Sequence, residues 1–386
     1  MTEAAIRRSR EAISKGRFAD AIQILEPLFL DGCEEPDVLL YLGMAYLQIE
    51  RPDSAVDVLE RAAEQVEDHC ILDMLLGRAY TATGCFDSAE IYLERAITRE
   101  PELVEAWIDL GKVLYFSHEY GEAARVLEDA VIRFPDNRAL HSIRAMSLYR
   151  LGDYTEATQE WGALCQVDPK NLKYVTTYAY SLLMLDRLNE ALPYVEKAKS
   201  IDSTSYRTVI LDAELSFRRG EPDLAYSRFR EALELSPDSL EALGRLAVIE
   251  SERGNEAQSK RYLELAEALV QEEPSSWQRL CDSYRLMEKH DRLIDCLTYA
   301  TRKDQGCAAA WIHLAKEYMQ QGLVEEAHYA WRESFTIRGY IKLHCSDCDT
   351  YFKVPYEDNS DYEPFDHAEC IYCNSPLPMP DSLADI

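Results

Sequence analysis

The chain has 386 residues, of which 47% are hydrophobic, and its 41 basic residues stand against 70 acidic ones, giving a formal net charge of −29. This imbalance argues against nucleic acid as a partner, because phosphate binding needs a concentrated basic face. No apolar run of about 18 residues occurs and the first residues lack the core of a signal peptide, so we expect a cytoplasmic protein that does not insert into a membrane.

A small residue recurs every 34 positions along most of the chain. Small residues are needed where two helices approach closely, so a gapless period of this length predicts stacked helical hairpins. Only two of the ten marked positions are not alanine. They are Ala21, Ala55, Ala89, Ala123, Ala157, Ala191, Ala225, Ser259, Leu293 and Ala327.

Two further small-residue positions repeat at the same interval. Twelve residues before each marked position, where the first helix of a hairpin would meet the second, stand residues such as Gly43, Gly77 and Gly111. Five residues before it, at the predicted turn, glycine can take the left-handed conformation that ends a helix. These turn glycines are Gly16, Gly84, Gly152, Gly220, Gly254 and Gly322.

The pattern resembles the tetratricopeptide repeat, as in AWIDLGKVLYFSHEYGEAARVLEDAVIRFP over residues 106–135. The resemblance implies an all-α fold, a right-handed superhelix of about ten helix-turn-helix repeats over residues 2–341. Repeats that start near Arg207, Leu240 and Pro274 depart from the pattern, so we expect the superhelix to be irregular there.

The concave surface of such a solenoid is lined by the first helix of each hairpin. From the third to the seventh repeat its candidate lining residues are aromatic, methionine and basic, the composition of interface hot spots. We predict a groove for a protein partner, either a peptide segment or an amphipathic helix with acidic and apolar anchors. The alternative is that some of these side chains pack against the next repeat. The candidate partner-binding residues are Arg78, Lys112, Tyr115, Phe116, Met146, Tyr149, Arg150, Tyr180, Met184, Phe217 and Arg218.

Two CxxC pairs follow the repeats, Cys345 with Cys348 and Cys370 with Cys373. Each pair can present two thiolates from a tight turn, and two such turns complete a tetrahedral metal site. The segment DTYFKVPY between the pairs alternates apolar residues and suits a strand of a hairpin. We therefore predict a small β module over residues 342–379, followed by a flexible tail over residues 380–386.

Four thiolates without an open position favour structural Zn²⁺, with iron as the alternative, because the same ligands would make a redox-active site. The module resembles a zinc ribbon or a rubredoxin-like pair of knuckles. Repeats followed by such a module resemble the lipopolysaccharide assembly protein B family, although we do not expect that family's N-terminal membrane helix here. The resemblance implies an adaptor that regulates turnover of an enzyme.

The histidines do not gather around a nucleophile and no phosphate-binding glycine loop occurs, so we predict that the chain is not an enzyme. Two functions remain. The first is an interaction scaffold whose zinc module caps the last repeat or adds a binding surface. The second is a regulatory adaptor in which metal loss or cysteine oxidation changes how the tail docks on the repeats.

Overall fold

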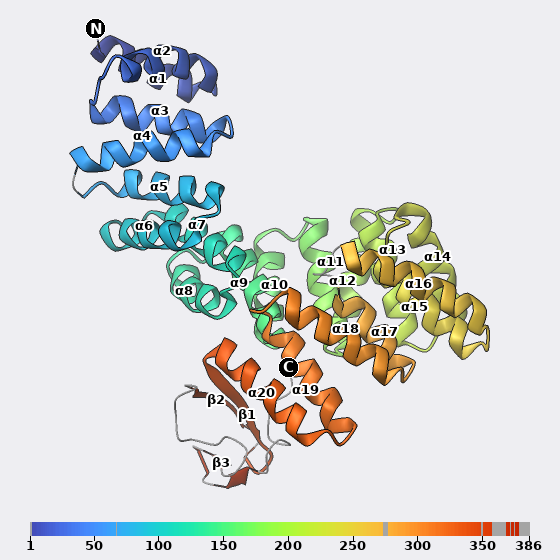
Figure 1. Cartoon of the computed structure of the whole chain (residues 1–386). Helices are drawn as coiled ribbons and strands as arrows, with labels where there is room; N and C mark the ends of the chain where they lie inside the picture. Colours follow the sequence, from blue (N-terminus) through green and yellow to red (C-terminus); the bar gives the residue numbers. More distant parts are fainter. Residues whose placement is uncertain are drawn as a thin grey trace. The chain divides into compact units, whose positions relative to one another are not determined.

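The computed structural model describes residues 2–66, 68–272, 277–348, 350–356, 368–370, 372–373 and 375–377. These residues form twenty α-helices followed by four short strands, which confirms the predicted all-α superhelix with a small β module (Figure 1). The predicted tail 380–386 and most of residues 357–379 lie outside the described residues. Contacts divide the chain into an N-terminal unit, Met1–Ile143, and a C-terminal unit, Arg144–Ile386.

The N-terminal unit consists of antiparallel helical hairpins that follow one another along the chain (Figure 1). Every second helix is related by the 34-residue period that the sequence predicts. They are α1 (Thr2–Ser14), α2 (Phe18–Leu30), α3 (Pro36–Gln48), α4 (Pro52–Gln65), α5 (Cys70–Thr83), α6 (Phe86–Arg99), α7 (Val104–Phe116), α8 (Tyr120–Arg133) and the first residues of α9 (Arg138–Leu151).

The C-terminal unit continues the hairpins and ends in the strands. Its helices are α10 (Tyr154–Val167), α11 (Leu172–Met184), α12 (Leu188–Ile201), α13 (Tyr206–Arg218), α14 (Pro222–Leu235), α15 (Leu240–Glu252), α16 (Glu256–Glu272), α17 (Trp277–Leu286), α18 (His290–Lys303), α19 (Ala308–Gln320) and α20 (Val324–Arg338). No described helix has the length and apolar character needed to span a bilayer.

The recurring small residues lie where the sequence predicts close packing. All ten marked positions, from Ala21 to Ala327, are buried. A Cβ added to Gly43 would lie 2.5 Å from the side chain of Leu59, and one added to Gly111 would lie 2.8 Å from Leu127. Both distances are far inside van der Waals contact, so a larger residue would force the two helices of the hairpin apart.

The turns within the hairpins also follow the period. All six predicted turn glycines have φ between 72° and 82°. In four other repeats the same position holds a residue with a side chain, and it too has positive φ: Glu50, His118, Asp186 and Glu288. The hairpin therefore imposes this backbone conformation even where the residue disfavours it.

Two of the three repeats predicted to be irregular, those starting near Leu240 and Pro274, differ from the others in helix length, whereas the repeat near Arg207 has ordinary helices of 13 and 14 residues. Helix α16 has 17 residues and α17 has 10, whereas most other helices have 13 or 14. Ser259 stands in α16 where other repeats have alanine, and its hydroxyl donates a hydrogen bond of 2.8 Å to the carbonyl of Ala247 in α15. The polar side chain is thus accommodated inside the hairpin by bonding to the facing helix.

Two small antiparallel sheets follow α20. Strand β1 (Tyr340–Cys345) pairs with β2 (Thr350–Pro355), with Lys342 opposite Lys353, and β2 confirms the strand predicted between the cysteine pairs. Strand β3 (Ala368–Glu369) pairs with β4 (Pro376–Leu377). The first sheet brings Cys345 to the end of a strand whose other end adjoins the last helix.

Candidate functional site

The four cysteines of the CxxC pairs lie together. Their Sγ atoms are all within 4.8 Å of one another, and the Cys345–Cys373 and Cys348–Cys370 pairs are each separated by 3.6 Å. A tetrahedron with zinc–sulfur bonds of about 2.3 Å has sulfur–sulfur separations of about 3.8 Å. The cluster therefore fits a four-thiolate metal ion, and rubredoxin-type iron has the same ligand set.

Local hydrogen bonds shape this cluster. The backbone amide of Tyr372 donates to Cys370 Sγ at 3.5 Å, and the amide of Cys370 donates to the carbonyl of Ser375 at 2.9 Å. Sulfurs that accept amide hydrogen bonds are suited to a structural metal site, because such bonds stabilise the thiolate form that a metal ion binds.

The strands that carry the cysteines pack on the last helical hairpin. Ile341, Leu343 and Phe352 share one buried cluster with Trp331 and Phe335 of α20. The ring centroids of Phe335 and Tyr356 lie 5.5 Å apart. The module therefore covers the apolar end that a terminal repeat would otherwise expose to water.

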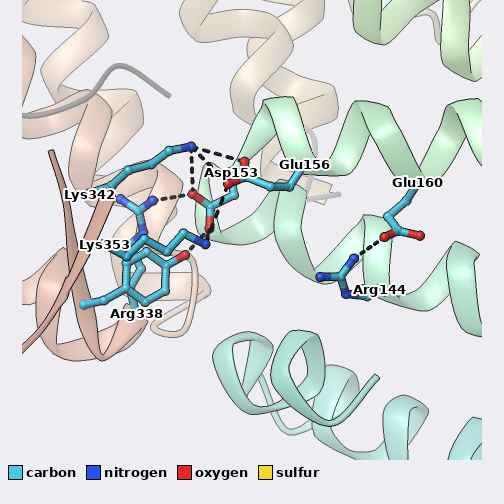
Figure 2. A network of polar contacts seen from close by, with 8 residues as sticks. Arg144, Asp153, Glu156, Glu160, Arg338, Lys342 and Lys353 are labelled. Carbon is cyan, nitrogen blue, oxygen red and sulfur yellow. Dashed lines mark hydrogen bonds and ion pairs between the residues drawn. The ribbon is translucent and has the colours of Figure 1, made fainter. Parts of the chain in front are cut away.

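A buried carboxylate joins this module to a distant helix of the same unit. Asp153 immediately precedes α10 and is completely buried. It accepts a hydrogen bond of 2.5 Å from Arg338 Nη2 and another from the hydroxyl of Tyr340. Lys342 Nζ and Lys353 Nζ lie 3.5 and 3.6 Å from its oxygens (Figure 2). One carboxylate thus faces three cations from α20, β1 and β2.

Glu156 extends this cluster by one turn of α10. Its carboxylate lies 3.1 Å from Lys342 Nζ and 3.7 Å from Lys353 Nζ. Burial alone would raise the pKa of Asp153, but the charges of Arg338, Lys353 and Lys342 outweigh it and hold that pKa below its usual value. The carboxylate is therefore ionised at neutral pH. We use the name Asp153 cluster for Asp153, Glu156, Arg338, Tyr340, Lys342 and Lys353.

Three further contacts join the same parts of the C-terminal unit. Arg150 in α9 forms an ion pair of 3.6 Å with Asp304, and Cys307 Sγ donates to the carbonyl of Arg150 at 3.5 Å. Tyr154 Oη lies 3.2 Å from His313 Nε2 in α19. The helices of this unit therefore curve until the start of α10 meets α19, α20 and β1, which closes the unit on itself.

The histidine in this junction is neutral. Burial, together with the positive charges of Arg285 and Lys316, lowers the pKa of His313 to about 3. Arg285 Nη2 lies 3.3 Å from His313 Nδ1. Because a guanidinium only donates, Nδ1 accepts this bond and Nε2 carries the proton toward Tyr154.

The closed unit encloses a cavity of about 500 Å³ on its concave side. Its walls combine aromatic and apolar side chains with charged ones contributed by helices from α9 to α19. They include Tyr149, Tyr154, Met184, Arg218, Arg245, Trp277, Asp282, Arg285, Leu286, His313 and Lys316. This mixture suits a ligand that is partly apolar and carries at least one charge.

Four of the predicted partner-binding residues belong to the N-terminal unit, and none of them lines this cavity. Arg78 forms an ion pair with Asp109, and Lys112 lies 3.4 Å from the same carboxylate. Tyr115 packs between the rings of Phe116 and Tyr120, which matches the alternative that such side chains serve packing. Phe116 itself is 56% exposed. Their role in partner binding stays a prediction.

The other seven predicted residues belong to the C-terminal unit. Tyr149, Met184 and Arg218 line the cavity, whereas Arg150 is engaged with Asp304. Tyr180 and Phe217 are half-buried, and Met146 is exposed. Three of the seven residues predicted to bind a partner thus line the cavity, and their role in binding stays a prediction.

Sequence reasoning did not single out Asp153, Arg245, Trp277 or His313 for these sites. One signal for the Asp153 cluster is present in the sequence. From residue 342 onward the chain holds ten acidic residues and only two basic ones, Lys342 and Lys353, and both lie in this cluster.

Family models describe the repeats. Three models, each described as a tetratricopeptide repeat, match residues 6–69 and 108–171, residues 216–283, and residues 74–105. These matches end before the four cysteines, and no zinc-ribbon model is among them.

Curated relatives are similar to the chain over its repeats. The TPR repeat-containing protein YpiA of Bacillus subtilis is 21% identical over 319 residues, which cover 80% of this chain and 73% of that protein. Human protein O-mannosyl-transferase TMTC1 is 24% identical over 61% of this chain, and a DnaJ homolog subfamily C member 7 homolog of Schizosaccharomyces pombe is 26% identical over 41%. The chain spans only 26% and 38% of the lengths of these two relatives.

A solved structure supports the fold. The C-terminal part of a TPR repeat-containing protein from Cytophaga hutchinsonii superposes with a TM-score of 0.54 at 15% identity, covering 62% of this chain and 99% of that one. Since three models of one repeat together match more than half of the chain, and the helices repeat at its period, the chain belongs to the tetratricopeptide-repeat proteins.

Proposed function

We propose that the chain is a non-enzymatic scaffold that holds a segment of a partner protein in the cavity of its C-terminal unit. The observation that carries this proposal is the cavity itself, whose wall is built from seven helices and combines Tyr, Trp and Arg side chains. These three residue types dominate the binding energy of protein interfaces. Tetratricopeptide-repeat proteins generally act in protein–protein interaction, which agrees with this use of the concave side.

The metal module has a structural part in this proposal. We assign Zn²⁺ to Cys345, Cys348, Cys370 and Cys373, with iron as the alternative, because four thiolates leave no position open for catalysis. The metal would hold the end of β1, whose Tyr340 and Lys342 contact Asp153. The module would thereby cap α20 and also keep the cavity closed.

Site-directed photo-crosslinking tests the proposal. We would place p-benzoylphenylalanine at Leu286, which lines the cavity and is 51% exposed. The matched control is Leu235 at the end of α14, which is 50% exposed and outside the cavity wall. Irradiation in native lysate followed by mass spectrometry should give a crosslinked protein with Leu286 that is absent with Leu235.

The same experiment can reject the proposal. Identical crosslinked proteins at both positions would show that the cavity selects no partner. Crosslinks only from residues of the N-terminal unit, such as Phe116, would move partner binding to that unit.

A second candidate function is a metal- or redox-responsive adaptor, in which metal loss releases the partner. The observation in its favour is that one short strand, β1, carries both a metal ligand and two groups of the Asp153 cluster. A chelator should then reduce the crosslinking yield at Leu286 by the same factor as a Cys370→Ser variant, and an unchanged yield in both would leave the scaffold without this control.

A further inference from the structure

The cavity wall is more basic than the chain that forms it. Four cationic side chains line it, Arg218, Arg245, Arg285 and Lys316, against two carboxylates, Asp186 and Asp282. The low pKa of His313 keeps that residue neutral. Glu214 behind this wall pairs with both Arg218 and Arg245, so with it the four cations face three carboxylates. One positive charge is left over on a chain with a formal net charge of −29, which points to an anionic group as the complement.

Arg245 is held in a fixed position by Glu214 and Phe217. Arg245 in α15 is only 4% exposed, and its Nε and Nη2 donate to the two oxygens of Glu214 at 2.8 and 3.0 Å. Glu214 also accepts a bond of 2.7 Å from Arg218 Nε. The face of the Arg245 guanidinium is covered by Phe217, whose ring centroid lies 5.1 Å from Cζ. Its position is therefore fixed before any ligand arrives.

Arg245 keeps one unused donor. Its Nη1 atom is buried, and no described residue forms a hydrogen bond with it. In a guanidinium bound through Nε and Nη2, Nη1 lies on the side away from the acceptor, so it faces away from Glu214. A buried donor without a partner is unfavourable, which means that a ligand oxygen placed there regains a hydrogen bond strengthened by charge.

A second unused donor belongs to the same wall. Trp277 in α17 is buried and lines the cavity, and its Nε1 has no hydrogen-bond partner within the part of the chain that the structure describes. Tyr149, Met184 and Leu286 supply apolar surface beside it. The wall thus combines an apolar surface with two buried donors, the cationic Arg245 Nη1 and the neutral Trp277 Nε1.

We propose that Arg245 marks a subsite for a carboxylate, filled by an aspartate or glutamate side chain of the bound partner segment with an apolar residue next to it. The inference rests on the proposed function, whose partner it describes. We choose an acidic side chain over a chain end because the cavity is lined from α9 to α19, so that a segment lying along the concave side presents its side chains to Arg245.

Selection from a library of random nonapeptides, with acetylated and amidated ends, tests the subsite on the full chain. The wild type should enrich peptides with one acidic residue beside an apolar one. In the double variant Glu214→Gln with Arg245→Gln this enrichment should disappear, and a selected peptide should bind about 10- to 100-fold more weakly. The double change removes one charge of each sign, so the net charge of the wall is unaltered.

Two comparisons separate the possible causes. Arg245→Lys keeps the charge but not the fork of donors, so it should restore little of the affinity. Lys316→Gln removes a cation from the same wall but no fork of donors, so it should reduce affinity by no more than about threefold. Circular dichroism of each variant shows that it is folded.

Several outcomes would overturn the subsite. Wild-type enrichment without an acidic residue would do so, and this readout does not depend on any variant folding. Selection of peptides only when they carry a free C-terminal carboxylate would reassign the subsite to chain ends. Peptides that bind equally to wild type and double variant would place the acidic residue elsewhere. All three leave the proposed function standing if Leu286 still crosslinks a partner, whereas loss of that crosslink rejects the function itself.

Discussion

Replacing Asp153 tests whether its cluster closes the C-terminal unit. Asp153→Ala removes the carboxylate that Arg338 pairs with. Arg338 is only 7% exposed, and no described residue forms a hydrogen bond with its Nε, so its charge would stay buried and unpaired. Removing one member of a buried ion pair costs about 3–5 kcal/mol. Lys353 adds little to this figure because its side chain is 42% exposed, and such contacts contribute about 1 kcal/mol or less.

The loss of stability should be confined to the segments that the Asp153 cluster joins. Repeat proteins open in segments, so hydrogen exchange followed by mass spectrometry is a better assay than a single unfolding curve. In Asp153→Ala we expect the opening free energy of residues 340–356 and 154–167 to fall by about 3–5 kcal/mol. The N-terminal unit serves as an internal control and should not change.

A double-mutant cycle tests whether the ion pair between Asp153 and Arg338 accounts for this loss of stability. Arg338→Met and Asp153→Ala should each be destabilising, and the double variant should be less destabilised than their sum, by about 1–3 kcal/mol. A coupling below about 0.5 kcal/mol would refute the reasoning, because the two residues would then act independently.

Three other perturbations have definite expected results. Chelation should unfold the strands around Cys345 while the helical signal in circular dichroism is kept, since about 40 residues have too little core to fold without a metal. Glu50→Gly should raise the unfolding free energy of the N-terminal unit by about 0.5–1 kcal/mol, because its φ of 58° suits glycine, and Gly84→Ala should lower it by about 1–2 kcal/mol. Urea titrations report both, and a destabilising Glu50→Gly would contradict the account. Because the pKa of His313 is lowered to about 3, the unfolded chain binds a proton more readily below about pH 6.5, so stability should fall there by at most about 1.4 kcal/mol per pH unit. His313→Gln should flatten the profile between about pH 6.5 and 4.5, and an identical profile would show that this residue does not titrate as described.

Much of the fold follows from local and periodic features of the sequence. The spacing of Ala21 and its equivalents predicts the hairpins, because a close approach between two helices favours small residues at nearly every repeat, with Leu293 as the exception. The turn glycines are predicted because the turn needs positive φ, and the period extends even to His118 and Asp186, which share this backbone conformation. The CxxC pairs predict the cysteine cluster because ligand spacing is a local property.

The closure of the C-terminal unit could not be predicted in this way. Asp153 precedes a helix and would ordinarily be read as its N-cap, yet its side chain makes no capping bond and is turned to Arg338 instead. Whether two distant repeats meet depends on small rotations that add up over several hairpins, and one sequence does not state those rotations. The unpaired donor of Arg245 depends on the same geometry.

The ion pair between Asp153 and Arg338 also fixes how many hairpins can lie between them. An open array of repeats tolerates gain or loss of a 34-residue repeat, since each repeat contacts only its neighbours. A closed one does not, because an added hairpin would carry Arg338 out of reach of its partner. These two residues are 185 positions apart, so their contact raises the contact order of an otherwise local fold. The closing step should therefore be the slowest stage of folding, and repeat number should be constrained in the C-terminal unit and free to vary in the N-terminal one.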